Sequence, residues 1–190
     1  MIQDWAPGRA WCPEGNLEVV GAFRFDDPEG RVGMETHVAA VGDTFVLVPL
    51  TYREAPLEGA DDAFIGEMHH SALGTRWVYD GLGDPTYLVM LAAVSLTGQG
   101  EALGLVEVDG RWHIAPANVR IQGGGFGLDR VPVDGMELVA DGVSPQFRSD
   151  GFEMTVHRQP TIGPRPTMGL TAHWDGLVES VVLTEVRARS

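Results

Sequence analysis

The sequence predicts a β-rich α+β fold, with a curved antiparallel sheet in the N-terminal half and further antiparallel hairpins in the C-terminal half. Three observations lead to this class. Apolar residues alternate with period two from Leu17 onward, residues 84–97 carry the start and stop signals of one main helix, and Asp-Gly pairs recur after Gly98. We divide the chain into an α+β region at 1–98 and an antiparallel β region at 99–190, packed together as one compact unit.

The first elements form an antiparallel meander. One face of the first strand is expected to carry Val19, Gly21, Phe23 and Phe25. Turn residues at 26–30 and a second alternating run to Ala40 complete a hairpin. Residues 44–50 are apolar on both faces, which is typical of a strand inside a sheet. Three antiparallel strands are therefore predicted before residue 54.

Two short strands and the main helix follow a loop at 54–62. The strands are predicted at 63–68 and 75–80, connected by residues 69–74. Asp84 is a suitable N-cap, Pro85 fits the first helical position and Gly98 supplies the stop. The helix should cover the sheet with its apolar residues Tyr87, Leu88, Leu91 and Val94.

The C-terminal half contains short strands separated by Asp-Gly pairs, which tolerate the positive φ of tight hairpin turns. These pairs begin at residues 109, 134, 141, 150 and 175. The glycine-rich residues 123–127 and the segment 160–166 are interpreted as flexible surface loops.

Charge and composition exclude several functions. The net charge of -14 should repel nucleic acid and anionic lipid. All 13 basic residues are Arg, so the chain lacks the Lys with which a Walker loop or a protein-kinase-like fold binds nucleotide phosphates. The absence of Lys also excludes Schiff-base chemistry. The lone Cys12 allows no intramolecular disulfide and suits a reducing compartment. Without a signal peptide or a long apolar run, we expect a cytoplasmic protein that does not contact membranes.

No pattern of residues indicates a catalytic, cofactor or metal site. Glu67 and the pair His69-His70 lack metal-ligand spacing, and His37, His113, His157 and His173 are scattered. The acidic pairs 26–27 and 61–62 are favoured as turn residues over paired catalytic carboxylates. There is no G-x-S-x-G motif, and Cys12 is favoured as a buried apolar residue over a reactive thiolate.

An aromatic and polar surface is the best candidate for binding. Its predicted members are Tyr52, Arg53, Glu67, His69, His70, Trp77 and Tyr79. Tyr and Trp can stack on a sugar ring or anchor a protein partner, but packing in the core is favoured over this role for these aromatic side chains.

Several spaced motifs resemble a known family. Residues 48–57 (VPLTYREAPL), 65–74 (IGEMHHSALG) and 76–80 (RWVYD), followed by Asp84-Pro85, are similar to the N-terminal cap domain of maltokinases and related glucosamine kinases. They resemble in particular a family of stand-alone cap-like proteins of unknown function. The resemblance begins near Arg9 and extends loosely to the Trp174-Asp175-Gly176 segment.

The resemblance implies a cystatin-like sheet that lies over the catalytic body of a sugar kinase in those enzymes. Because catalysis belongs to that body, no catalytic residue is carried over to this chain. The segment before Trp11 is shorter than in such proteins, which is expected to leave an edge strand uncovered. We expect a non-catalytic module that binds a sugar kinase, another glucan-metabolism enzyme or itself. A small-molecule or carbohydrate-binding protein is the alternative.

Overall fold

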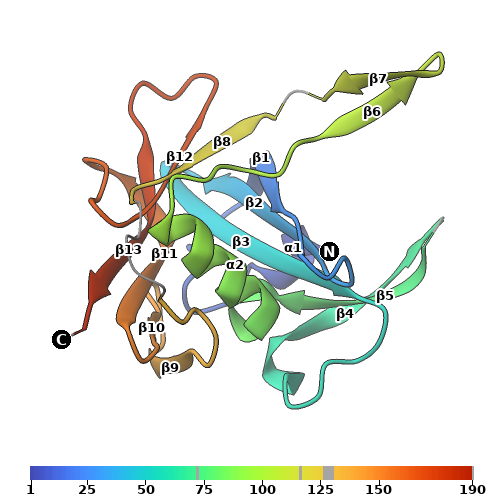
Figure 1. Cartoon of the computed structure of the whole chain (residues 1–190). Helices are drawn as coiled ribbons and strands as arrows, with labels where there is room; N and C mark the ends of the chain where they lie inside the picture. The colour runs from blue at the N-terminus through green and yellow to red at the C-terminus, as the bar shows by residue number, and fades with distance from the viewer. Residues whose placement is uncertain (72, 116, 126–130, 190) are drawn as a thin grey trace.

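The computed structural model describes residues 1–71, 73–115, 117–125 and 131–189. In this part of the chain, antiparallel strands form a five-stranded sheet, a six-stranded sheet and a separate two-stranded hairpin. One main helix, α2, lies against the sheets (Figure 1). The predicted β-rich α+β class is confirmed.

The five-stranded sheet has the order β1-β2-β3-β5-β4. Its strands are β1 (Leu17–Phe25), β2 (Gly33–Val41), β3 (Thr44–Arg53), β4 (Phe64–His70) and β5 (Gly74–Asp80). The meander is confirmed, and β3 is internal because it pairs with both β2 and β5. A register shift between Val19 and Gly21 interrupts the alternation of β1. Val19 is therefore 44 % exposed, contrary to its predicted place beside Phe23.

The β4–β5 connection differs from the prediction, whereas the β1–β2 turn agrees with it. His69 and His70 are the last residues of β4, so they do not belong to the connection to β5 as expected. The β1–β2 turn has the predicted acidic residues, and the side chain of Asp27 accepts hydrogen bonds from the backbone N–H groups of residues 29, 31 and 32. Asp61 lies in the short 3-10 helix η1 (Asp61–Ala63). Asp27 thus has the local structural role expected of a turn residue.

Helix α2 (Pro85–Leu96) begins and ends close to the predicted bounds. The Asp84 side chain caps it by accepting a hydrogen bond from the backbone N–H of Thr86 at 2.9 Å. The four apolar residues expected to face the sheet are buried. In addition, Tyr87 and Thr36 share a buried hydrogen bond of 2.6 Å, which ties the helix to β2. Another short 3-10 helix, η2 (Gly81–Gly83), precedes it.

The six-stranded sheet has the order β8-β12-β13-β11-β10-β9. Its strands are β8 (Val119–Gly123), β9 (Glu137–Ala140), β10 (Gln146–Arg148), β11 (Phe152–Ile162), β12 (Gly169–Trp174) and β13 (Val181–Ala188). The Asp-Gly pairs at 141, 150 and 175 connect hydrogen-bonded neighbours of this sheet. The pair at 109 joins β6 (Leu105–Val108) to β7 (Arg111–Ile114). The pair at 134 instead precedes β9 without connecting two paired strands.

The two predicted surface loops are partly wrong. Gly123 is the last residue of β8, and an added Cβ would lie 2.1 Å from the carbonyl oxygens of Val94 and Thr97. Glycine is needed there because the strand passes directly under the end of α2. Residues 126 and 127 of the glycine-rich stretch lie outside the described residues. Pro160 is buried in β11, at a register shift that accommodates its missing N–H.

The two sheets share one hydrophobic cluster with α2. It combines Phe23, Met34 and Leu47 of the first sheet with side chains of the second sheet such as Phe152 and Leu183. A smaller cluster covers part of the opposite face of the first sheet, where Trp11 and the helix α1 (Ile2–Trp5) pack over β2 and β3. The cluster that the two sheets share contains side chains from both 1–98 and 99–190.

A buried ion pair joins the sheets. Arg158 of β11 is 4 % exposed and donates a hydrogen bond to Asp80 at the end of β5. The guanidinium carbon of Arg158 lies 4.6 Å from the centre of the Trp11 ring, and the Gln159 side chain donates to the Trp11 carbonyl at 2.9 Å. The N-terminal segment is therefore fastened to the C-terminal half.

Candidate functional site

Arg53, a predicted surface residue, is engaged by the cap of α2. Its Nε and Nη2 atoms donate to the two carboxylate oxygens of Asp84 at 2.7 and 2.6 Å. Thr51 also donates to Asp84, whose side chain has no exposed surface. The hydrogen bonds to Asp84 raise the pKa of Arg53, although partial burial opposes this effect. Arg53 thus holds the helix against β3, which limits its use in binding.

Tyr79 is also structural. Only 3 % of Tyr79 is exposed, and its hydroxyl oxygen accepts a hydrogen bond of 2.8 Å from the backbone N–H of Leu57. Its ring packs on Phe64 with a centroid distance of 5.4 Å. The side chain therefore fixes the loop between β3 and β4, and core packing, the alternative considered for the aromatic residues, applies to Tyr79.

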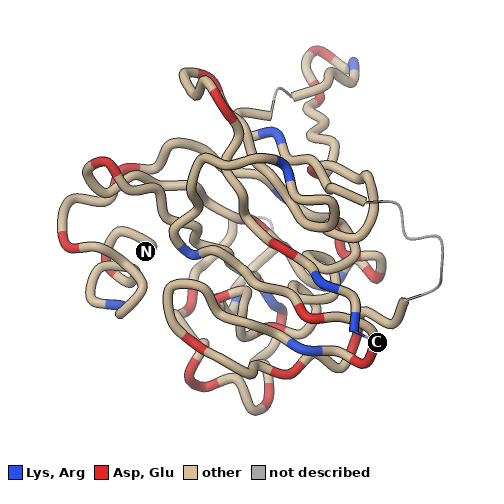
Figure 2. The backbone as a smooth tube through the Cα atoms, turned by 90° about the vertical axis from the view of Figure 1, so that its left-hand side faces the viewer, with Lys and Arg blue, Asp and Glu red and all other residues tan. Residues whose placement is uncertain are grey.

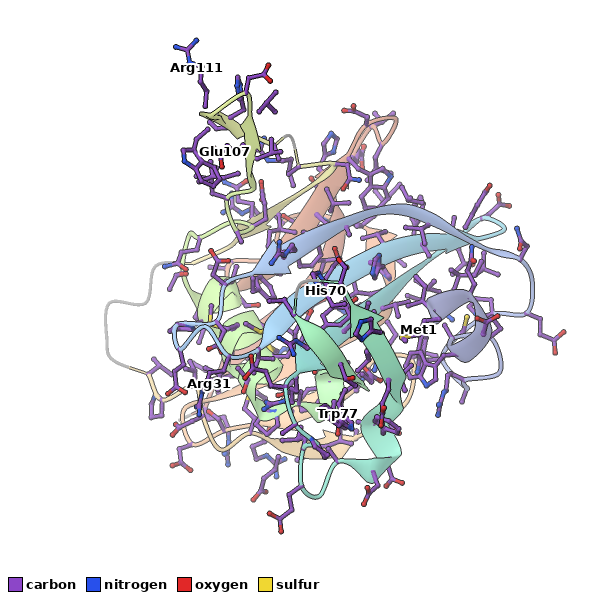
Figure 3. All side chains as sticks on the ribbon, turned by 90° about the vertical axis from the view of Figure 1, so that its right-hand side faces the viewer. Met1, Arg31, His70, Trp77, Glu107 and Arg111 are labelled. Atoms are coloured by element: carbon purple, nitrogen blue, oxygen red, sulfur yellow. The ribbon has the colours of Figure 1, made fainter. Side chains whose placement is uncertain are left out.

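The strand register divides the predicted surface between two faces of the sheet. Tyr52 pairs with Val78 and His70 with Gly74, so both side chains belong to the face that carries Trp11. Arg53 and Glu67 both pair with Trp77, on the opposite face, where His69 and Tyr79 also belong. Figure 3 shows His70 and Trp77 in the β4–β5 hairpin. A single concave surface with all seven side chains does not exist.

Two hollows lie on either side of the β1–β2 turn. One, of about 590 Å³, includes Arg53 and the start of α2. The other, of about 650 Å³, includes Tyr52 and His70, together with residues that the sequence analysis did not single out: Arg24, Glu35 and Arg76. The alternation of β2 could have placed Glu35 on this face, but its side-chain contact with Tyr52 depends on the β2–β3 register, in which Glu35 lies opposite Leu50 and Tyr52 opposite Gly33.

Glu35 and Tyr52 both have perturbed pKa values in this second hollow. Its Oε2 atom lies 3.2 Å from Nε2 of His37 and accepts a hydrogen bond of 3.4 Å from the Tyr52 hydroxyl. The hydrogen bond from His37 lowers the pKa of Glu35, and the contact with Tyr52 adds to this effect. Burial and the neighbouring Glu35 carboxylate raise the pKa of Tyr52. Glu35 is accordingly an ionised acceptor beside a protonated phenol at neutral pH.

The remaining candidates concern metal binding and the reactivity of the thiol. Within the described ranges, no group of three His, Cys, Asp or Glu side chains could hold a metal ion. Cys12 is half-buried, less covered than expected, and its burial raises the pKa of the thiol. Trp174, the first residue of the Trp174-Asp175-Gly176 segment, is the last residue of β12 and packs edge-to-face against Phe45 with a centroid distance of 4.9 Å. In this part of the chain, no helix has the length and hydropathy of a membrane span.

The β6–β7 hairpin is the most exposed apolar feature of the described residues, and we call residues 103–114 the arm. Figures 1 and 3 show it projecting from the body, with Glu107 and Arg111 labelled in Figure 3. Its turn is tight, because Asp109 and Gly110 have φ values of 52° and 74°. The exposed apolar side chains of the arm are Leu103, Leu105, Val106, Val108, Trp112 and Ile114.

These features define a compact α+β protein of antiparallel sheets that presents a projecting apolar arm and a polar hollow. Residues 2–84, which end at the N-cap of α2, match the family described as the maltokinase N-terminal cap domain. The resemblance to this cap family is therefore confirmed over the five-stranded sheet, whereas α2, the arm and the six-stranded sheet lie beyond the match. No curated protein matches the chain.

Proposed function

We propose that this protein is a non-catalytic cap-like module that binds a sugar kinase or another enzyme of glucan metabolism. The match of residues 2–84 to the maltokinase cap carries this proposal. The chain contains no Lys with which a kinase of the usual kind holds nucleotide phosphates. A cap-like chain without the Lys that holds nucleotide phosphates is best suited to bind an enzyme and not to transfer phosphate itself.

The arm is the surface through which we expect the contact to form. A two-stranded hairpin by itself is marginally stable in water, and among the described residues β6 and β7 pair with each other and with no further strand. Trp112 is 69 % exposed and Ile114 is 71 % exposed. Large apolar groups gathered at one exposed place mark interaction surfaces, and Trp is enriched among the residues that dominate binding.

The strand register of the arm and the charge of the chain indicate what kind of partner surface would complement them. Leu105 pairs with Ile114, and Glu107 with Trp112, so one face of the arm is apolar with a single carboxylate. Acidic residues are spread over many loops of the body (Figure 2), in keeping with a net charge of -14. A partner with an apolar groove and a basic rim complements both features.

Quantitative affinity capture tests the proposal. The wild-type chain and a Trp112→Glu variant are immobilised separately and exposed to lysate of the source organism, and the retained proteins are compared by mass spectrometry. We expect a sugar kinase or glucan-metabolism enzyme to be enriched on the wild type and lost from the variant. The retained enzyme is then purified and mixed with each form to establish direct binding.

A matched substitution controls for the loss of an exposed side chain. Val178 is 94 % exposed in the β12–β13 connection, far from the arm in sequence, and Val178→Glu adds the same charge. This variant should retain the enzyme. The proposed partner is wrong if no carbohydrate enzyme is retained in a way that requires Trp112. It is also wrong if sedimentation velocity shows that the arm mediates self-association instead.

A further inference from the structure

The hollow beside Tyr52 is bounded by two separate parts of the first sheet. The β1–β2 turn contributes Asp27 and Arg31 to one wall, and the tip of the β4–β5 hairpin contributes His70 and Leu73 to the other. Figure 3 shows Arg31 and His70 on the side of the molecule that faces the viewer. The volume of about 650 Å³ lies within the usual range for small-molecule sites.

The floor offers an aromatic ring beside a hydrogen-bond acceptor. Tyr52 is half-buried, and its hydroxyl donates to Oε2 of Glu35. His37 contacts the same oxygen, so both contacts leave Oε1 of Glu35 able to accept from a ligand. The Asp27 carboxylate, in contrast, is already occupied by three backbone N–H groups of its own turn. Glu35 is therefore the acceptor best placed for a bound molecule.

The guanidinium groups of the hollow are balanced by carboxylates. Arg76 is paired with Glu54 at 3.3 Å, and Arg31 with Glu29. Arg24 lies opposite Glu35 in the β1–β2 register, close enough to help lower the pKa of Glu35. Three Arg side chains and four carboxylates line the hollow: Arg24, Arg31, Arg76, Asp26, Asp27, Glu35 and Glu54. A phosphorylated ligand would meet these carboxylates, which makes its binding costly.

We propose that this hollow binds a neutral polyhydroxylated compound of the size of a monosaccharide or disaccharide. Glu35 accepts hydrogen bonds from its hydroxyl groups, Arg76 donates to them, and the Tyr52 ring packs against its apolar face. This arrangement of an aromatic ring with charged donors and acceptors suits a molecule that is rich in hydroxyl groups and carries no charge. The site is separate from the arm and goes beyond partner binding.

Isothermal titration calorimetry of the full chain tests this site. The neutral probes are maltose and trehalose, and the charged probes are glucose 6-phosphate and glucosamine, all at millimolar concentrations. We expect saturable binding of at least one neutral sugar and weaker binding of the charged probes. Glu35→Gln should lose at least about tenfold in affinity, because the amide oxygen is a neutral and therefore weaker acceptor than the carboxylate. Tyr52→Leu should weaken binding while keeping an apolar floor.

Glu67→Gln is the matched control, since Glu67 is exposed on the opposite face of the same sheet. It should bind the sugar as the wild type does, and thermal unfolding of each variant shows whether its fold is intact. The proposal is overturned if neither neutral sugar binds, if charged probes bind as well as neutral ones, or if Glu67→Gln loses as much affinity as Glu35→Gln. The Trp112→Glu variant should keep sugar binding, so failure here is distinct from failure of the partner proposal.

Discussion

Replacement of Asp84 by Ala should remove the main polar attachment of α2 to the first sheet. The Asp84 carboxylate is buried and accepts from Thr51, Arg53 and the N–H of Thr86. Ala provides none of these acceptors. The start of α2 then has an uncapped N–H, and Arg53 has a guanidinium without its carboxylate.

The expected loss follows from these two effects. An N-cap contributes about 1 kcal/mol to the free energy of unfolding. Breaking a buried ion pair costs about 3–5 kcal/mol, but 19 % of the Arg53 side chain is exposed, so water can partly replace Asp84. We expect a combined loss of about 3 kcal/mol, less than the whole stability of a typical domain. For a chain of this length, the unfolding midpoint should fall by roughly 6–12 °C.

Urea unfolding followed by circular dichroism measures the loss. Asp84→Asn keeps an acceptor for the cap and removes the charge, so it should be less destabilising than Asp84→Ala. The double variant Arg53→Met/Asp84→Ala should be more stable than the sum of the single variants predicts, by at least about 1 kcal/mol, because no unpaired charge remains. If Asp84→Ala costs less than about 1 kcal/mol, the attachment described here does not hold α2 in place.

Three further predictions concern other parts of the molecule. Gly123→Ala should destabilise by about 1–3 kcal/mol in thermal unfolding, because its Cβ would meet the carbonyl oxygens at the end of α2; an unchanged midpoint would contradict the close packing. The lowered pKa of Glu35 contributes stability that is present above the ordinary pKa of 4.5 and is lost as pH falls through the lowered value. The thermal midpoint of Glu35→Gln should therefore depend less on pH in acid than that of the wild type, and parallel pH profiles of the two forms would disprove this contribution. Burial raises the pKa of Cys12, so iodoacetamide should alkylate it more slowly than free glutathione at neutral pH, and an equal rate would refute this.

Local patterns predicted most of the fold. The main helix was predictable because Asp84, Pro85 and the following apolar residues act within one segment. The meander and the hairpins at 109, 141, 150 and 175 follow from alternation and turn residues, which are also local. The role of Gly123 was not predictable, since the carbonyl groups that it approaches belong to a helix about thirty residues earlier. The same applies to Arg158, whose partner Asp80 lies in the other sheet.

The candidate site was less predictable than the fold. Aromatic and charged residues were recognised by type, but their faces depend on strand register, which separated Tyr52 from Trp77. Arg53 and Tyr79 have structural partners, Asp84 and the N–H of Leu57, that the sequence pattern did not reveal. Glu35 became a candidate only when β2 and β3 were aligned. The order of the strands and their pairing decide which side chains can act together.

The most direct test of the proposed function is a binding titration between the purified chain and the purified sugar kinase or glucan-metabolism enzyme that affinity capture identifies. We predict saturable binding by the wild type and at least about a tenfold weaker affinity for Trp112→Glu, since truncating an aromatic anchor of an interface removes much of its binding energy. Equal affinity of the two forms, or no binding by either, would contradict a cap-like module that acts through its arm.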